Sequence, residues 1–329
     1  MKFRYFAISL FLSIMVLACN DKEDEPNPVT DPNEAESACY VTEYTTTNNY
    51  PNSYDNSWEE YKSTINIAYD ADYRIKRIDE LVFNGICTNG QCIDTKDHLE
   101  FLYDNNGKLM QIESYEEGVM YQKAVYDYNS AKQVSKFIIY GEKTGVAGLI
   151  MYGYYMYEYN NRGNITNAKF FDASNNQFVE EYKFEYNSSN LMTAIDAIEI
   201  DGYRVKVQYE YDGNELVRKA WATADGRWGE EIMFGDKNGA FAATIKKNPL
   251  IFNYPVPDIT PIFDEYEYEF KKIITNIRGW EPGPQDLLEN MDRTGSPTYE
   301  FSKEGYPTKV AFDNYGGGKL TTIYKYKCE

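Results

Sequence analysis

The stretch Tyr157-Glu-Tyr-Asn-Asn-Arg-Gly-Asn-Ile165 decides the fold of this chain. Its two tyrosines alternate with a glutamate, which is the period-two pattern of a strand with one buried face. Asparagine and glycine follow, and they favour a tight turn. An Asn side chain bonds the backbone two residues on, and glycine tolerates positive φ. The stretch therefore predicts the end of one strand, a turn and the start of a returning strand.

The same phrase recurs along most of the chain, and the recurrence predicts an array of hairpins. Aligned on the aromatic–Asp/Asn pair, firm copies stand at Tyr69-Asp70, Tyr103-Asp104, Tyr128-Asn129, Tyr159-Asn160, Tyr186-Asn187 and Tyr211-Asp212. Looser copies stand at Phe234-Gly-Asp-Lys-Asn-Gly239 and Phe301-Ser-Lys-Glu-Gly305. The firm copies are 25 to 34 residues apart, a period typical of one supersecondary unit per repeat.

Alternation assigns the two faces of the incoming strands. Tyr157 and Tyr159 flank Glu158, and sister copies repeat this order. We therefore expect an aromatic ladder in the core and carboxylates on the opposite face. After each turn, apolar residues such as Ile75 and Ile78 follow three apart. That spacing requires either a bulge or a sheet covered on both faces.

Composition agrees with an all-β protein. The chain has 329 residues with 32 Tyr and 17 Phe, and aromatic residues favour strands. We expect consecutive antiparallel β-hairpins that form an extended or curled meander sheet. Residues 246–262 hold four prolines and are predicted to be a long packed loop. At most one short helix is expected, near residues 284–292.

The net charge limits the partners. It is −19, and removal of residues 1–18 would delete Lys2 and Arg4 and leave −21. Such a field repels nucleic acid, so we exclude DNA and RNA as partners. A solvated acidic surface explains the charge without any further ligand.

The N-terminus predicts the location of the protein. Residues 1–18 have a basic start and an apolar run of signal-peptide length, too short for a spanning helix. Val16-Leu17-Ala18-Cys19 resembles the bacterial lipobox, which implies lipidation at Cys19 and attachment to the membrane. An ordinary signal peptide with an incidental cysteine is the alternative. Residues 19–38 are acidic and nearly free of aromatics, which predicts a disordered tether. The hairpin domain then covers residues 39–329.

The repeats also carry a family likeness. The Tyr-Asp/Asn-x-x-Gly-x-Leu/Ile units resemble the tyrosine-aspartate repeats of the Rhs and teneurin class. The whole pattern is similar to Bacteroidota lipoproteins of unknown function, through the lipobox, Lys247-Asn248-Pro249 and Glu304-Gly-Tyr-Pro-Thr-Lys309. The acidic run Asn20–Glu25 resembles the export signal that places such lipoproteins on the cell surface. The alternative is that the run is an ordinary lipoprotein tether, which is polar and often acidic. The resemblance implies a β-rich repeat fold displayed on the outer membrane, and no activity.

Cysteine and histidine usage argues against a metal centre. His98 is the single histidine, which excludes multi-histidine metal sites. We expect His98 to be a solvated residue at a strand edge. Four cysteines follow Cys19, an even number that indicates disulfides in an exported chain. Cys87 and Cys92 bracket an Asn-Gly turn and are expected to pair. Cys39 would then pair with Cys328 if the array curls enough. We expect no metal and no cofactor.

Three function classes stay open on sequence. A non-catalytic binding module for a glycan or protein ligand is favoured, with Trp221, Trp228 and Trp280 near turns as candidate ligand contacts. A polysaccharide hydrolase with a carboxylate pair is the enzyme alternative, although no two acids stand apart from the rest. A purely structural cell-envelope protein is the third. We assign no catalytic residue.

Overall fold

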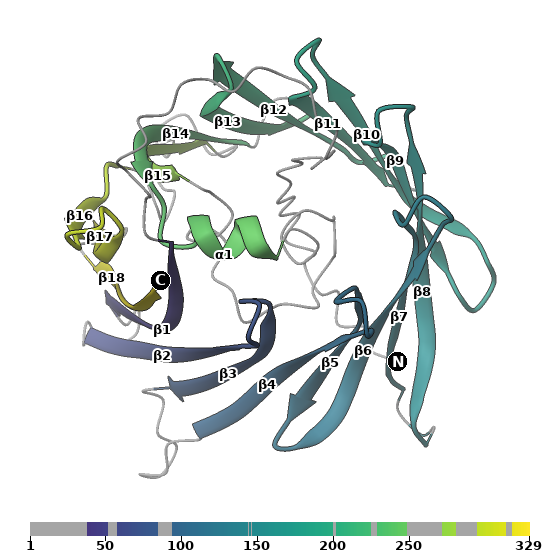
Figure 1. Ribbon diagram of the computed structural model, residues 1–329, viewed down its shortest axis with the longest axis horizontal. Coiled ribbons are helices and arrows are strands. Elements are labelled where there is room, and N and C mark those ends of the chain that lie inside the picture. The colour runs from purple at the N-terminus through teal and green to yellow at the C-terminus, as the bar shows by residue number, and fades with distance from the viewer. Residues whose placement is uncertain are drawn as a thin grey trace.

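The fold is known from a computed structural model (Figure 1) that describes residues 38–51, 58–84, 94–143, 145, 147–199, 202–224, 229–248, 272–280, 295–313 and 318–329. Residues 19–37 of the expected tether, Cys19 among them, the pair Cys87 and Cys92 and the segment 284–292 lie outside the described residues. In the described part, no helix is long and apolar enough to cross a membrane.

Eighteen strands and one helix make up the described secondary structure. The strands are β1 (Cys39–Pro51), β2 (Trp58–Tyr69), β3 (Ile75–Asn84), β4 (Asp94–Tyr103), β5 (Leu109–Glu116), β6 (Val119–Tyr128), β7 (Val134–Glu142), β8 (Leu149–Tyr159), β9 (Ile165–Asp172), β10 (Phe178–Tyr186), β11 (Met192–Glu199), β12 (Arg204–Asp212), β13 (Glu215–Thr223), β14 (Gly229–Asn238), β15 (Lys272–Trp280), β16 (Thr298–Phe301), β17 (Pro307–Asp313) and β18 (Lys319–Cys328). The helix is α1 (Ala242–Lys247).

The strands form one sheet of consecutive antiparallel hairpins, which confirms the predicted fold class. The sheet is curled, because β1 pairs with β2 on one side and with β18 on the other. Between β15 and β16 the described contacts are an isolated bridge from Ile277 to Gly295 and hydrogen bonds of Tyr299 with the backbone of Ile274. The sheet therefore stays open there, and Figure 1 shows it as an incomplete ring.

The turn after β8 closes with the chemistry that the repeated phrase predicts. Asn160 Oδ1 accepts hydrogen bonds from the backbone N–H groups of Arg162 (2.9 Å) and Asn164 (3.0 Å). Gly163 has φ of 85°, the left-handed conformation that glycine adopts without a steric penalty. The hydroxyl of Tyr159 then donates to the carbonyl of Val134 in the preceding unit (2.6 Å). This last bond fastens one hairpin to the next.

That tyrosine hydrogen bond recurs around the sheet. The same donation joins Tyr69 to Val41, Tyr103 to Ile75, Tyr128 to Leu109, Tyr186 to Ile165, Tyr299 to Ile274 and Tyr326 to Pro307. A buried carbonyl without a partner would be costly. The repeated tyrosine is therefore a structural tie between neighbouring units.

A bulge explains the apolar residues three apart. Tyr69 pairs with Ile75, but Ala68 pairs with Arg77, so Lys76 is an extra residue in β3. The bulge returns Ile78 to the face of Ile75, and both side chains are fully buried. Equivalent register shifts follow the other firm copies. Of the two explanations offered by the sequence, the bulge is the one observed.

The aromatic face is the inner face of the curled sheet and forms the core. Tyr44, Tyr126, Tyr155 and Phe137 are almost completely buried there, whereas Glu158 on the alternate face is exposed. The inward aromatic ladder and outward carboxylate of this repeat thus follow the predicted alternation.

The short helix α1 lies inside the ring (Figure 1). Phe241 precedes it and packs between Tyr44 and Tyr324, with ring centroids 5.6 and 6.1 Å away. Asn248 ends it, and its Oδ1 accepts a hydrogen bond from the backbone N–H of Ile75 (2.8 Å). Lys246 and Lys247, which the sequence placed in the packed loop, belong to this helix instead. Contacts made inside the ring stabilise the turn of helix, and local sequence does not report them.

A disulfide joins the two ends of the described domain. Cys39 in β1 is bonded to Cys328 in β18, and their Cα atoms are 4.1 Å apart. These two residues are also direct partners in the β1–β18 ladder. The curl of the sheet brings them together.

Candidate functional site

An apolar row crosses the outer face of the sheet. Its members are direct cross-strand partners on five successive strands, β6 to β10: Val125, Ile138, Tyr154, Phe171 and Phe178. We call this set the outer row. All five are half-buried. At about 4.8 Å between strands, the row is about 19 Å long.

The aromatic members of the outer row contact one another. Tyr154 stacks on Phe171 with ring centroids 5.4 Å apart, and Phe178 meets Phe171 edge-on at 6.4 Å. Offset stacking and edge contacts are the preferred geometries of aromatic pairs. The adjoining residue Met156 is 49% exposed. The result is a continuous apolar strip bordered by charged side chains.

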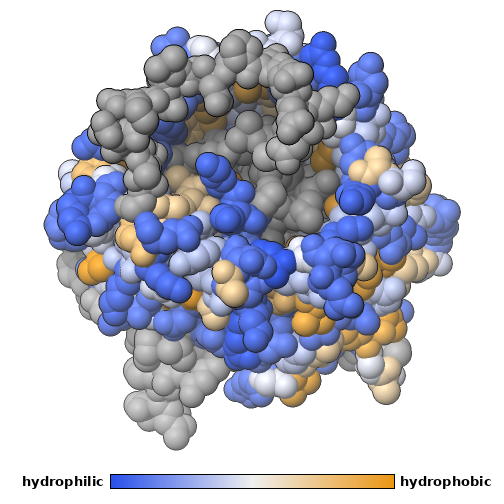
Figure 2. Space-filling view, viewed as in Figure 1, coloured by the Kyte–Doolittle hydropathy of each residue, from blue (hydrophilic) through white to orange (hydrophobic). Residues whose placement is uncertain are grey.

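Charged side chains border the strip. The Lys136 ammonium lies 3.9 Å from the centroid of the Tyr154 ring, a cation–π contact. Lys169 is within 3.6 Å of carboxylates of both Glu158 and Glu181. Figure 2 shows apolar side chains among hydrophilic ones at the lower right, over β5–β8 in the view of Figure 1. An apolar centre with a polar rim is the usual anatomy of a binding surface.

The sequence contained a signal for the outer row. In Met151-Tyr-Gly-Tyr-Tyr-Met-Tyr157 the aromatics do not alternate with polar residues, and Phe170-Phe171 is a second such break. Tyr155 and Tyr157 face the core, so Tyr154 and Met156 must face outward. Loss of period two in an antiparallel strand means that both faces carry apolar side chains.

The tryptophans occupy different environments. Trp221 lies in β13, packs against the core, and its Nε1 is buried without a hydrogen-bond partner among the described residues. Its ring is therefore half-buried against the core. Trp228 lies outside the described residues, and Trp280 is described only as the last backbone position of β15. Ala222 pairs with Gly229, and Gly229 pairs with Trp280, so the backbones of Trp221 and Trp280 lie at neighbouring register positions of β13 and β15.

Two carboxylates meet near the inner face. Glu80 in β3 and Asp97 in β4 are direct cross-strand partners. Burial raises the pKa of Glu80 to about 7, against a weaker lowering by the hydroxyl of Ser63, which donates to it at 3.1 Å. Burial also raises the pKa of Asp97, and the nearby Glu116 adds to the rise. The pKa values of both acids are therefore raised.

His98 does not lie on a sheet edge, contrary to expectation. β4 is paired on both sides, and the imidazole stacks on Tyr115 with centroids 4.4 Å apart. Its side chain is only 14% exposed. Burial lowers the pKa of His98. The residue is thus a packed member of the outer face.

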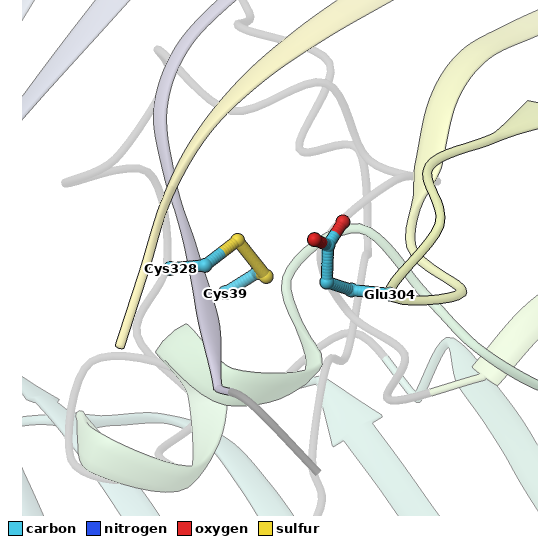
Figure 3. Close-up of side chains that lie close together, drawn as sticks. All are labelled: Cys39, Glu304 and Cys328. Atoms are coloured by element: carbon cyan, nitrogen blue, oxygen red, sulfur yellow. A yellow bond between two sulfur atoms is a disulfide. The ribbon is translucent and has the colours of Figure 1, made fainter.

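A cluster of possible metal ligands has a simpler explanation. Cys39, Cys328 and Glu304 place ligand-type atoms within 4.8 Å of one another. Figure 3 shows the Glu304 carboxylate facing the bonded sulfur atoms. A thiolate is the species that binds a metal, and both sulfurs are held in the disulfide. The cluster therefore does not form a metal site while that bond is intact.

Comparison with known proteins gives no family. No family model matches the sequence, and no curated protein matches it either. A porin-like protein from Bacteroides uniformis is similar in structure, with a TM-score of 0.44 and 11% identity over 87% of this chain and 98% of the other. A porin-like protein from Bacteroides vulgatus gives 0.32 and 10% over 88% and 98%. A chain of the Tc holotoxin pore of Photorhabdus luminescens gives 0.33 and 12% over 78% and 13%. These values are too low to carry an argument about function.

Proposed function

We propose that the protein is a lipid-anchored binding module on the outer face of the outer membrane. The lipobox around Cys19 and the acidic run behind it support the location. The outer row supports the binding role, because a contiguous apolar strip with a charged border is typical of interaction sites in soluble proteins. Tyr, Phe and Met are enriched at protein interfaces. A protein ligand therefore fits the outer row better than a glycan.

Binding to intact cells tests the proposal. The full-length protein in detergent, fluorescently labelled, is applied to protease-treated, periodate-treated and untreated cells of its source bacterium and to a glycan array. Phe171→Glu places a charge in the middle of the outer row. Ile323→Glu is the matched control, because Ile323 is an apolar side chain of β18 that is 50% exposed.

The expected result is saturable binding that Phe171→Glu reduces about tenfold or more and Ile323→Glu leaves unchanged. Protease treatment of the cells should abolish it, and periodate should not. Equal binding by both variants would show that the outer row is not the binding surface. Far-UV circular dichroism of each variant checks that the sheet is retained.

A further inference from the structure

A groove runs along the outer face of β13, several strands away from the outer row. Its floor is formed by Ala220, Ala222 and Ala224, which alternate along the strand and have side chains too short to fill the surface. The cavity above them has a volume of about 430 Å³, within the range of small-molecule sites. The first and the last of these alanines are about 13 Å apart along the strand. We call this cavity the alanine groove.

The two neighbouring strands shape the alanine groove differently. On β12, Gln208 is the cross-strand partner of Ala220, and Lys206 is the partner of Ala222. Both long side chains are exposed and line the cavity. On β14, Ala222 is paired with Gly229, which has no side chain. The groove therefore has a polar wall along β12 and is wide beside Gly229.

The charges around the alanine groove balance. Among the described side chains of β11 to β14, three cations and three carboxylates surround the floor: Arg204, Lys206, Arg218, Asp196, Glu210 and Glu231. Arg204 donates from Nε and Nη2 to Asp196. Lys206 stands directly opposite the same carboxylate in the ladder. The groove thus offers no net charge that would select an anion or a cation.

The ion pairs also hold hydrogen-bonding groups in place. Arg218 donates to Glu210 and to Glu231, the latter at 2.7 Å. A guanidinium has five N–H donors and a carboxylate has several acceptor sites, so both kinds of group keep unused capacity after pairing. Gln208 adds an amide donor and an amide acceptor. Because paired side chains have already lost rotational freedom, a ligand that binds them pays less ordering entropy.

The floor and the walls together select a class of ligand. Alanine methyl groups offer an apolar floor for the C–H face of a sugar ring, and each sugar hydroxyl can both donate and accept a hydrogen bond, as the walls require. An apolar ligand would remove water from the charged walls without replacing its hydrogen bonds. A peptide strand fits less well, because β13 is paired on both sides and has no free edge. A polyanion is opposed by the net charge of −19.

We infer that the alanine groove is a binding site for a neutral oligosaccharide. One sugar ring would lie over Ala222, and its hydroxyl groups would exchange hydrogen bonds with Gln208 and with the pair of Arg218 and Glu231. Hydrogen bonds from hydroxyl groups to charged partners are stronger than those between neutral groups. The site is separate from the outer row and does not rest on the function proposed for it.

Titration calorimetry on the full-length protein, in a detergent without a sugar head group, tests the inference. Cellotetraose, maltotetraose and tetra-N-acetylchitotetraose are the neutral probes. The glucosamine tetramer is the cationic match of the last of these, and tetragalacturonate is the anionic probe. Ala222→Leu fills the groove, whereas Ala222→Ser keeps it open and is the matched control. Gln208→Leu removes the amide donor and acceptor from the wall.

At least one neutral probe should bind with a Kd below about 1 mM, and more tightly than either charged probe. Ala222→Leu should weaken that binding about tenfold or more, because the floor is filled, while Ala222→Ser retains it. Gln208→Leu should weaken it about threefold to tenfold, the range expected for one neutral hydrogen bond. Circular dichroism of each variant checks that the sheet is retained.

Three results would each overturn the inference. They are the failure of every neutral probe to bind with a Kd below about 1 mM, an unchanged affinity in Ala222→Leu, and tighter binding of a charged probe than of any neutral one. Phe171→Glu should bind the oligosaccharide normally, so failure here leaves the outer row untouched.

Discussion

Removing the Cys39–Cys328 disulfide should be the most destabilising small change in this fold. The bond links residues 289 positions apart, so it restricts nearly the whole hairpin domain when the chain is unfolded. The chain-entropy relation gives roughly 5–6 kcal/mol for a loop of this length. Removal of a native disulfide typically costs about 2–5 kcal/mol, so we expect Cys39→Ser/Cys328→Ser to lose about that much unfolding free energy.

Urea unfolding followed by circular dichroism measures the loss. Parent and variant both carry Cys87→Ser and Cys92→Ser, so that no other pair of these cysteines can bridge. Dithiothreitol added to the parent should reproduce the effect of the double substitution, and added to the variant it should do nothing. A difference below about 0.5 kcal/mol, which is the usual scale of neutral surface changes, would refute the reasoning. It would mean that the β1–β18 ladder alone holds the two ends of the hairpin domain together, with the disulfide or without it.

Three further outcomes are expected. Cys19→Ala should release the protein from the membrane fraction, and continued sedimentation with membranes would contradict lipidation. Tyr159→Phe should cost about 1 kcal/mol in urea unfolding, because the carbonyl of Val134 loses its donor; an unchanged midpoint would show that water replaces the hydroxyl. The pKa of Glu80 is raised by burial from 4.5 to about 7, so the folded state holds this proton more tightly than the unfolded state. The resulting contribution to the free energy of unfolding is full below pH 4.5 and is lost as the pH rises to about 7. Glu80→Gln should remove this loss, about 1–3 kcal/mol after allowance for partial solvent screening, and an identical pH profile of stability in the variant would contradict it.

The hairpin unit was predictable because its causes are local. Asn160 and Gly163 close their turn through bonds within five residues. Tyr157 alternates with Glu158 because a strand has period two. Even the bulge after the turn was one of two explanations that the apolar spacing required. These interactions depend on neighbouring residues, so the sequence shows them directly.

The candidate sites were less predictable because they depend on register between strands. The outer row exists because Ile138, Tyr154 and Phe171 stand opposite one another. The tryptophans drew attention by residue type, yet the ring of Trp221 packs against the core. A surface site is an arrangement across strands, and residue type alone does not define it.

The sequence by itself determined the repeat, the antiparallel sheet and the inward aromatic face, since turn chemistry and period-two alternation act over a few residues. Tertiary structure alone decided that the sheet curls until β1 meets β18, that α1 lies within it, and which outward apolar residues stand opposite one another in a row. Each hairpin adds a small rotation set by twist and bulge. The sum over eighteen strands determines which distant residues meet.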